Sequence, residues 1–131
     1  MRKCKLVDNY KMSREVYQKR RKVINLLYEA RRSGVKFDRI EVRIGKPANP
    51  REDSGLLGVA TMQGKEMWIV ESALELGNDW LRLVVFHELG HALFGLEHDE
   101  KCPLMKATHD TTQPAISKED CVKHLLKYQD R

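Results

Sequence analysis

Apolar and polar side chains follow two different periods in the first third of this chain. Over Ser13–Arg32 the apolar side chains recur at nearly helical spacing, with lysines and arginines opposite them, and Ser33-Gly34 follows. This pattern predicts an amphipathic helix that ends at the glycine. Over Ile40–Ile44 apolar and charged residues nearly alternate, which predicts a half-buried strand that ends at Gly45-Lys46-Pro47.

Two further strands are expected in the middle of the chain. Leu56–Met62 and Glu66–Val70 are separated only by Gln63-Gly64-Lys65, a connection short enough for a hairpin. Residues 48–54, which include Asn49-Pro50, are expected to form a loop. Together with the earlier strand, these two strands predict a small mixed sheet.

A long apolar helix is expected next. Asn78 or Asp79 can cap its N-terminus, the helix itself is predicted from about Trp80 to Phe94, and Gly95 suits the left-handed residue that ends a helix. Apolar side chains occur on all sides of this segment. We therefore expect the helix to lie in the centre of the core.

The last part of the chain is predicted to be irregular over residues 97–116 and helical after that. Ser117 followed by Glu119-Asp120 indicates a helix start, and the inward face of this helix is predicted to be Val122, Leu125, Leu126 and Tyr128. Helices and strands intermixed in 131 residues predict a single α+β domain over residues 1–131, with residues 1–12 as a candidate flexible segment.

Charge is distributed unevenly along the chain. Residues 1–36 contain 12 Lys/Arg and 3 Asp/Glu, whereas residues 37–131 contain 12 and 16, which together give the net charge of +5. Because apolar residues interleave with the basic ones, we interpret the basic cluster as the solvated face of the first helix and not as a nucleic-acid or membrane surface. No apolar run is long enough for a signal peptide or a bilayer span, so a cytoplasmic location is expected.

The three cysteines are Cys4, Cys102 and Cys121. An odd number excludes a complete disulfide framework, so reduced thiols are expected, although a single Cys102–Cys121 bridge stays open. Cys102 is also a candidate fourth ligand in a closed structural metal site, against the simpler interpretation of a small buried side chain.

The central helix carries the candidate chemistry in the run His87-Glu88-Leu89-Gly90-His91. Two histidines four residues apart on a helix lie about 40° from one another, so both imidazoles can bind one zinc ion. Glu88 is one position further along and can take a proton from a water on that zinc as the water attacks a peptide carbonyl. The pattern also arises by chance, but unpaired His and Glu are costly to bury in so apolar a helix.

A catalytic zinc needs a third protein ligand and an open fourth position. Gly95 allows a sharp turn, after which His98 can return to the metal, and Glu97 is the alternative ligand. His109 and His124 lie among polar residues and are expected to be solvated.

Residues 80–105 resemble the metzincin clan of zinc endopeptidases, and the matrixin-like members most closely. Leu57–Met62 resembles their substrate-binding edge strand, and Cys102-Pro103-Leu104-Met105 resembles their Met-turn, with Met105 beneath the zinc. Ile116–Asp120 resembles the start of their final helix. The resemblance implies a zincin-like fold, bound Zn²⁺, and hydrolysis of a protein or peptide substrate that pairs with the edge strand, with Glu88 as general base.

One departure from the metzincin pattern affects the third ligand. The usual motif has its glycine seven residues after the first histidine and its third ligand ten after, whereas here Gly95 is eight and His98 eleven residues after His87. With the usual spacing, Phe94 would occupy the position of the glycine and Glu97 the position of the third ligand. We favour His98, because the turn requires the glycine.

Two other functions are compatible with the same residues. Cytosolic anti-repressor peptidases of phages and mobile elements share the two histidines and the glutamate but take an acidic third ligand from further downstream. A zinc-stabilised interaction domain would bind the metal without hydrolysis.

Overall fold

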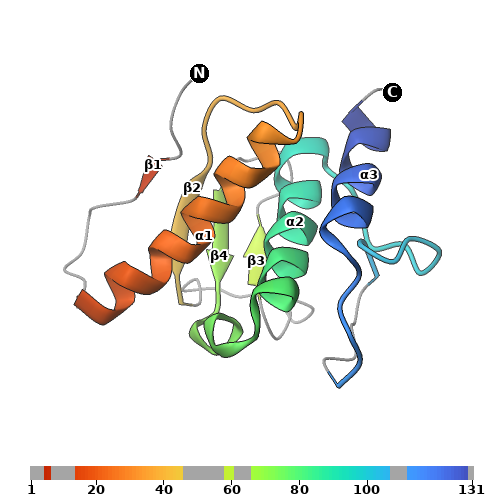
Figure 1. The fold of residues 1–131 in the computed structure, drawn as a ribbon. Coiled ribbons are helices and arrows are strands. Elements are labelled where there is room, and N and C mark those ends of the chain that lie inside the picture. Colours follow the sequence, from red (N-terminus) through yellow and green to blue (C-terminus); the bar gives the residue numbers. More distant parts are fainter. Residues whose placement is uncertain (1–4, 7–13, 46–57, 61–65, 107–111, 130–131) are drawn as a thin grey trace.

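The computed structural model describes residues 5–6, 14–45, 58–60, 66–106 and 112–129. In chain order, the elements are β1 (Lys5–Leu6), α1 (Arg14–Arg32), β2 (Glu41–Ile44), β3 (Gly58–Ala60), β4 (Glu66–Ile69), the 3-10 helix η1 (Glu71–Glu75), α2 (Asn78–Phe94) and α3 (Lys118–Gln129). The helix α2 lies between α1 and α3, and α1 and α2 both pack on the sheet (Figure 1). The expected α+β class is confirmed.

The four strands form one sheet in the order β1-β2-β4-β3. β2 is parallel to both β1 and β4, and β3 is antiparallel to β4 and lies at one edge. The three predicted strands are confirmed where they are described, whereas the predicted turn at 63–65 and loop at 48–54 lie outside the described residues. No pattern predicted β1, since a two-residue strand is too short to show a period.

The first helix forms as predicted, but its basic residues are not all solvated. Ser33 and Val35 donate backbone hydrogen bonds to the carbonyls of the last turn, and Gly34 has a φ of 108°. Arg20 and Arg31 are buried, contrary to the expected exposed basic face. Arg20 donates to the backbone carbonyl of Val42, 3.2 Å away, so this side chain ties α1 to the sheet.

The second helix begins two residues earlier than predicted. Its N-cap is Gly77, which provides no side-chain hydrogen bond, so neither Asn78 nor Asp79 acts as the cap. The preceding η1 was also not predicted, because a single 3-10 turn has no distinctive pattern. Gly95 ends α2 in the left-handed conformation, as expected.

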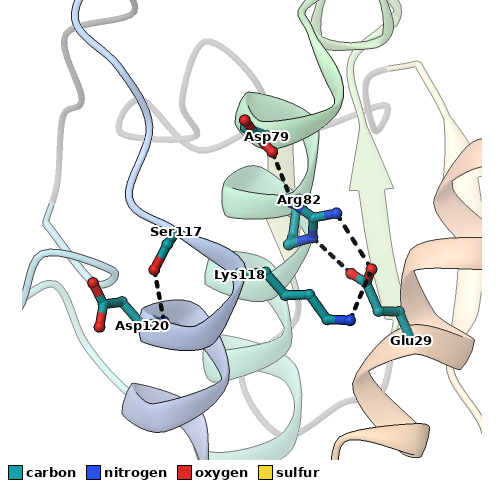
Figure 2. Close-up of polar contacts among 6 residues, drawn as sticks. All are labelled: Glu29, Asp79, Arg82, Ser117, Lys118 and Asp120. Atoms are coloured by element: carbon teal, nitrogen blue, oxygen red, sulfur yellow. Dashed lines mark hydrogen bonds and ion pairs between the residues drawn. The ribbon is translucent and has the colours of Figure 1, made fainter.

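The third helix begins where the sequence indicated. The Ser117 hydroxyl accepts a hydrogen bond from the Asp120 backbone N–H at 3.2 Å, which caps the helix (Figure 2). Leu125 is fully buried as predicted, whereas Val122, Leu126 and Tyr128 are only partly buried. Cys121, which the pattern did not place inside, is fully buried against α2 and its neighbours.

A charged cluster connects the three helices (Figure 2). Arg82 of α2 donates to both carboxylate oxygens of Glu29 on α1, at 2.6 and 3.3 Å, and to Asp79 at 2.9 Å. Lys118 of α3 lies 3.6 Å from the Glu29 carboxylate. Burial raises the pKa of Glu29, but the hydrogen bond and charge of Arg82, together with Lys118, lower it further, so the net pKa lies below its ordinary value.

The described core is continuous across the helices and the sheet, and α2 contributes more of its buried residues than any other described element. Val42 of β2 and Met67 and Ile69 of β4 are buried beneath the helices. Among the described helices, none is long and apolar enough to cross a membrane.

Candidate metal centre

Two histidines of α2 direct the same ring nitrogen toward one point. His87 and His91 are 8% and 7% exposed, and their Nε2 atoms are 3.2 Å apart. The rings meet edge to face, with centroids 4.8 Å apart. The helical spacing predicted this convergence.

The other nitrogen of each ring is held by a backbone carbonyl. His87 Nδ1 lies 2.7 Å from the carbonyl oxygen of Leu104, and His91 Nδ1 makes the same kind of contact with Leu96. A carbonyl can only accept, so each Nδ1 carries the hydrogen and each Nε2 presents its lone pair. Two lone pairs this close repel each other, and a cation between them removes that repulsion.

His98 reaches the pair by way of the turn at Gly95. Gly95 has φ 64° and ψ 27°, and its N–H and that of Leu96 bond to the carbonyls of the last helical turn. The His98 ring lies 5.4 Å from that of His87 and 5.0 Å from that of His91, between centroids. The turn therefore completes a nearly equilateral triangle of imidazoles, with His98 itself exposed.

The three histidines have the donor set of a catalytic zinc site. One nitrogen from each lies within 4.8 Å of the others. Nitrogen ligands about 2.0–2.1 Å from a tetrahedral zinc are themselves about 3.3 Å apart, which the 3.2 Å between the two helical Nε2 atoms matches. Among the residues that the structure describes, this group is the one of three or more His, Cys, Asp or Glu that could hold a metal, and neither Glu97 nor Cys102 belongs to it.

Glu88 is the buried carboxyl group of the site. It is 5% exposed, and burial raises its pKa to about 8. A nearby divalent cation stabilises the charged carboxylate and would therefore lower this pKa. Glu88 directly follows His87 on α2, and a carboxyl group with a pKa near neutrality is suited to act as a general base.

Met105 packs against α2 at Gly90. Its side chain is fully buried, and its sulfur lies so near Gly90 that a Cβ there would be 2.7 Å from Sδ. The loop that carries it is closed by backbone bonds from Asp99 to Met105, from Cys102 to Asp99 and from Met105 to Cys102. Gly90 allows this contact, and a glycine inside an otherwise apolar helix was the available sequence signal for it.

The anchoring carbonyls of Leu96 and Leu104 were not anticipated. Every residue has a carbonyl, so no side-chain pattern could identify them. The loop closure that brings Leu104 under His87 depends on tertiary structure, which the spacing of the histidines does not reveal.

The two described cysteines do not form the bridge that the sequence left open. Cys102 and Cys121 are both buried free thiols. Burial raises the pKa of Cys121 to about 12. His124, expected to be solvated, is partly buried with Nδ1 3.8 Å from the Cys102 sulfur, and His109 lies outside the described residues.

Among the described strands, β3 lies at the edge of the sheet next to the helix α2. β3 is the outer strand beyond β4 and it contacts α2. Its described part, Gly58–Ala60, falls inside the predicted substrate-binding strand 57–62, whose remaining residues lie outside the described part.

Comparison with known proteins gives one family. A family model described as Matrixin matches residues 8–125, nearly the whole chain. No curated protein matches the sequence.

Proposed function

The chain belongs to the matrixin family of zinc metallopeptidases, and from this premise we propose that it is an endopeptidase whose zinc is held by His87, His91 and His98. The single observation that carries the proposal is the convergence of these imidazoles on one point. Their neutral nitrogens suit zinc, and the two carbonyl contacts fix the rings before the ion arrives.

Zinc, when bound, would make a water molecule acidic and polarise the scissile carbonyl. Glu88 would take the proton of the attacking water and then deliver it to the leaving amine. The burial of Glu88 supports this role, because burial raises the pKa of its carboxyl group and so makes the carboxylate a stronger base. Met105 would keep the helix and the ligand rings in place from below.

The substrate would bind in extended form along β3. β3 is the last strand of the described sheet, and pairing of a peptide with such a strand aligns the peptide without reading its sequence closely. The contact of β3 with α2 supports this site, since it brings a bound peptide beside the helix that carries Glu88.

The test is the zinc-dependent cleavage of a denatured protein and a peptide library. The account predicts hydrolysis that stops with a chelator and returns with zinc, and a loss of about 100-fold or more in Glu88→Gln with zinc still bound. Equal hydrolysis by wild type and Glu88→Gln would exclude Glu88 as the base. Bound zinc without any hydrolysis in the wild type would favour a zinc-stabilised interaction domain.

A further inference from the structure

One histidine outside the metal centre faces the loop that carries Met105. His124 lies on α3, and its Nδ1 is 3.8 Å from the sulfur of Cys102. Cys102 is 5% exposed, so its thiol is enclosed where it meets the imidazole. A thiol is both a weak donor and a weak acceptor, and a ring nitrogen can take either role, so the two groups form a polar contact. This contact joins α3 to the loop formed by residues 99–105.

Cys102 is central to the hydrogen bonds of that loop. Its N–H donates to the carbonyl of Asp99 at 3.0 Å, and its own carbonyl accepts from the N–H of Met105 at 3.1 Å. Leu104 lies between Cys102 and Met105 in the chain, and its carbonyl oxygen is 2.7 Å from Nδ1 of His87. A displacement of Cys102 would therefore also move the carbonyl that orients one of the proposed zinc ligands.

The helix that carries His124 is attached to α1 near both of its ends. At the start of α3, Lys118 lies 3.6 Å from the carboxylate of Glu29 (Figure 2). At its end, the Gln129 side chain donates to the carbonyl of Gly34 at 2.9 Å. His124 lies between these two attachments, so α3 provides the loop with a support that does not depend on the metal centre.

We propose that His124 is a positioning residue of the metal centre: through Cys102, it holds the loop so that the Leu104 carbonyl stays on Nδ1 of His87. His124 is not one of the converging imidazoles. It limits the motion of the loop, which keeps the Nε2 lone pair of His87 directed at the metal position. The consequence for zinc binding rests on the ligands of the proposed function, whereas the effect on the His87 ring does not.

The first test is NMR of the imidazole groups in the full-length, zinc-free protein. In the wild type, His87 should carry its hydrogen on Nδ1, and this hydrogen should exchange slowly with water. Exchange should be severalfold faster in His124→Ala. His124→Asn is the conservative variant, because its amide places a polar atom where Nδ1 was, and it should keep the slow exchange. Lys123→Ala, at the exposed neighbouring position of α3, is the matched control and should behave as the wild type does.

Zinc affinity provides the second test. Loss of a group that directly holds a metal ligand lowers metal affinity by about 10- to 100-fold. Because His124 acts through one further contact, His124→Ala should lower zinc affinity by about three- to tenfold, and His124→Asn should restore it. The double variant of Cys102→Ala and His124→Ala should lose no more affinity than Cys102→Ala alone, because the effect passes through the Cys102 side chain.

Circular dichroism verifies that each variant is folded. If His124→Ala does not fold, His124→Gln replaces it, since the extra methylene group moves the amide away from the position of Nδ1. Any one of four results would overturn the proposal: unchanged exchange of the His87 hydrogen in His124→Ala, equal effects of His124→Ala and Lys123→Ala, no rescue by His124→Asn, or additive losses in the double variant.

The positioning role and the proposed function fail in different ways. Faster exchange of the His87 hydrogen in His124→Ala, in a protein that binds zinc but hydrolyses nothing, would refute the peptidase and leave the positioning role. Zinc-dependent hydrolysis by a protein whose His87 ring is unaffected by His124→Ala would refute the positioning role alone.

Discussion

The metal centre has a buried, helical half and an exposed half in a loop. His87 and His91 belong to one helix, are nearly inaccessible, and have their rings fixed by carbonyls. His98 is exposed and follows a left-handed turn, in a loop closed by a few backbone bonds. The helix therefore preforms two of the three proposed zinc ligands, whereas the third proposed ligand depends on where one turn occurs.

We propose that the one-residue insertion expected from the sequence is accommodated at the C-terminal end of α2. α2 continues as far as Phe94, and Gly95 provides its left-handed cap. The spacing from Gly95 to His98 is the same as in the usual motif, so the turn and the third histidine move together. Glu97 keeps the usual distance from His87 but does not join the imidazoles.

The largest effect is expected from breaking the helical half. His91→Ala removes one member of the preformed pair and leaves Glu88 buried without its cation. Loss of a residue that only holds a metal ligand in place lowers metal affinity by about 10- to 100-fold. Loss of the ligand itself should lower zinc affinity by more than about 100-fold, and hydrolysis should fall below detection. Zinc analysis after dialysis checks this, and stoichiometric zinc in His91→Ala would contradict it.

A smaller loss of zinc is expected from breaking the loop half. His98→Ala leaves the helical pair intact, so zinc affinity should fall by at least about 10-fold, but by less than in His91→Ala. Glu97→Ala is the matched control one residue away and should bind zinc as the wild type does. A competition titration with a zinc-sensitive dye measures the zinc affinity of both variants. A greater loss of affinity in Glu97→Ala than in His98→Ala would show that Glu97, at the usual spacing from His87, is the third ligand.

The packing of Met105 against α2 can be tested by a substitution at Gly90. In Gly90→Ala the new methyl group would lie 2.7 Å from the buried Met105 sulfur, and overpacking costs about 1–3 kcal/mol. The higher helix propensity of alanine offsets about 1 kcal/mol of this cost, so the net destabilisation should be up to about 2 kcal/mol. Gly77→Ser is a control in the same helix, since nothing lies within 4 Å of that position and serine is a good N-cap. Urea unfolding compares them, and a gain in stability of about 1 kcal/mol in Gly90→Ala, which helix propensity alone would give, would refute the close contact.

The smallest effect concerns the charged cluster that holds α1 and α3 to α2. The pKa of Glu29 is lowered in the folded protein, so its contribution to stability is present above its unfolded pKa of about 4.3 and is lost as the pH falls through the folded pKa. The wild type should therefore lose more stability than Glu29→Gln on acidification below about pH 5. Thermal unfolding from pH 7 to pH 3 measures the difference, and parallel curves would contradict the role of Glu29.

The sequence predicted most of what depends on local pattern. The helical pair, the turn at Gly95 and the start of α3 at Ser117 each have a signal within a few residues, and all three elements lie where expected. Long-range contacts were not predictable in this way. The burial of Arg20 depends on the Val42 carbonyl of β2, and β1 exists only because β2 lies beside it.

The contacts that complete the site are also long-range, so the local sequence pattern did not predict them. The Leu104 carbonyl reaches His87 because the loop after α2 folds back on the helix, and the same loop brings the Met105 sulfur next to Gly90. The choice of His98 over Glu97 depended on a turn whose glycine could be recognised, but the position of the ring in space required the structure.

The central claim is that three imidazoles, including that of His98, hold the zinc. X-ray absorption at the zinc edge tests it most directly, because it reports the nature and number of the ligands. The account predicts three imidazole nitrogens at about 2.0–2.1 Å in the wild type and in Glu97→Ala, and two in His98→Ala. An unchanged imidazole count in His98→Ala, or a carboxylate ligand that disappears in Glu97→Ala, would contradict it.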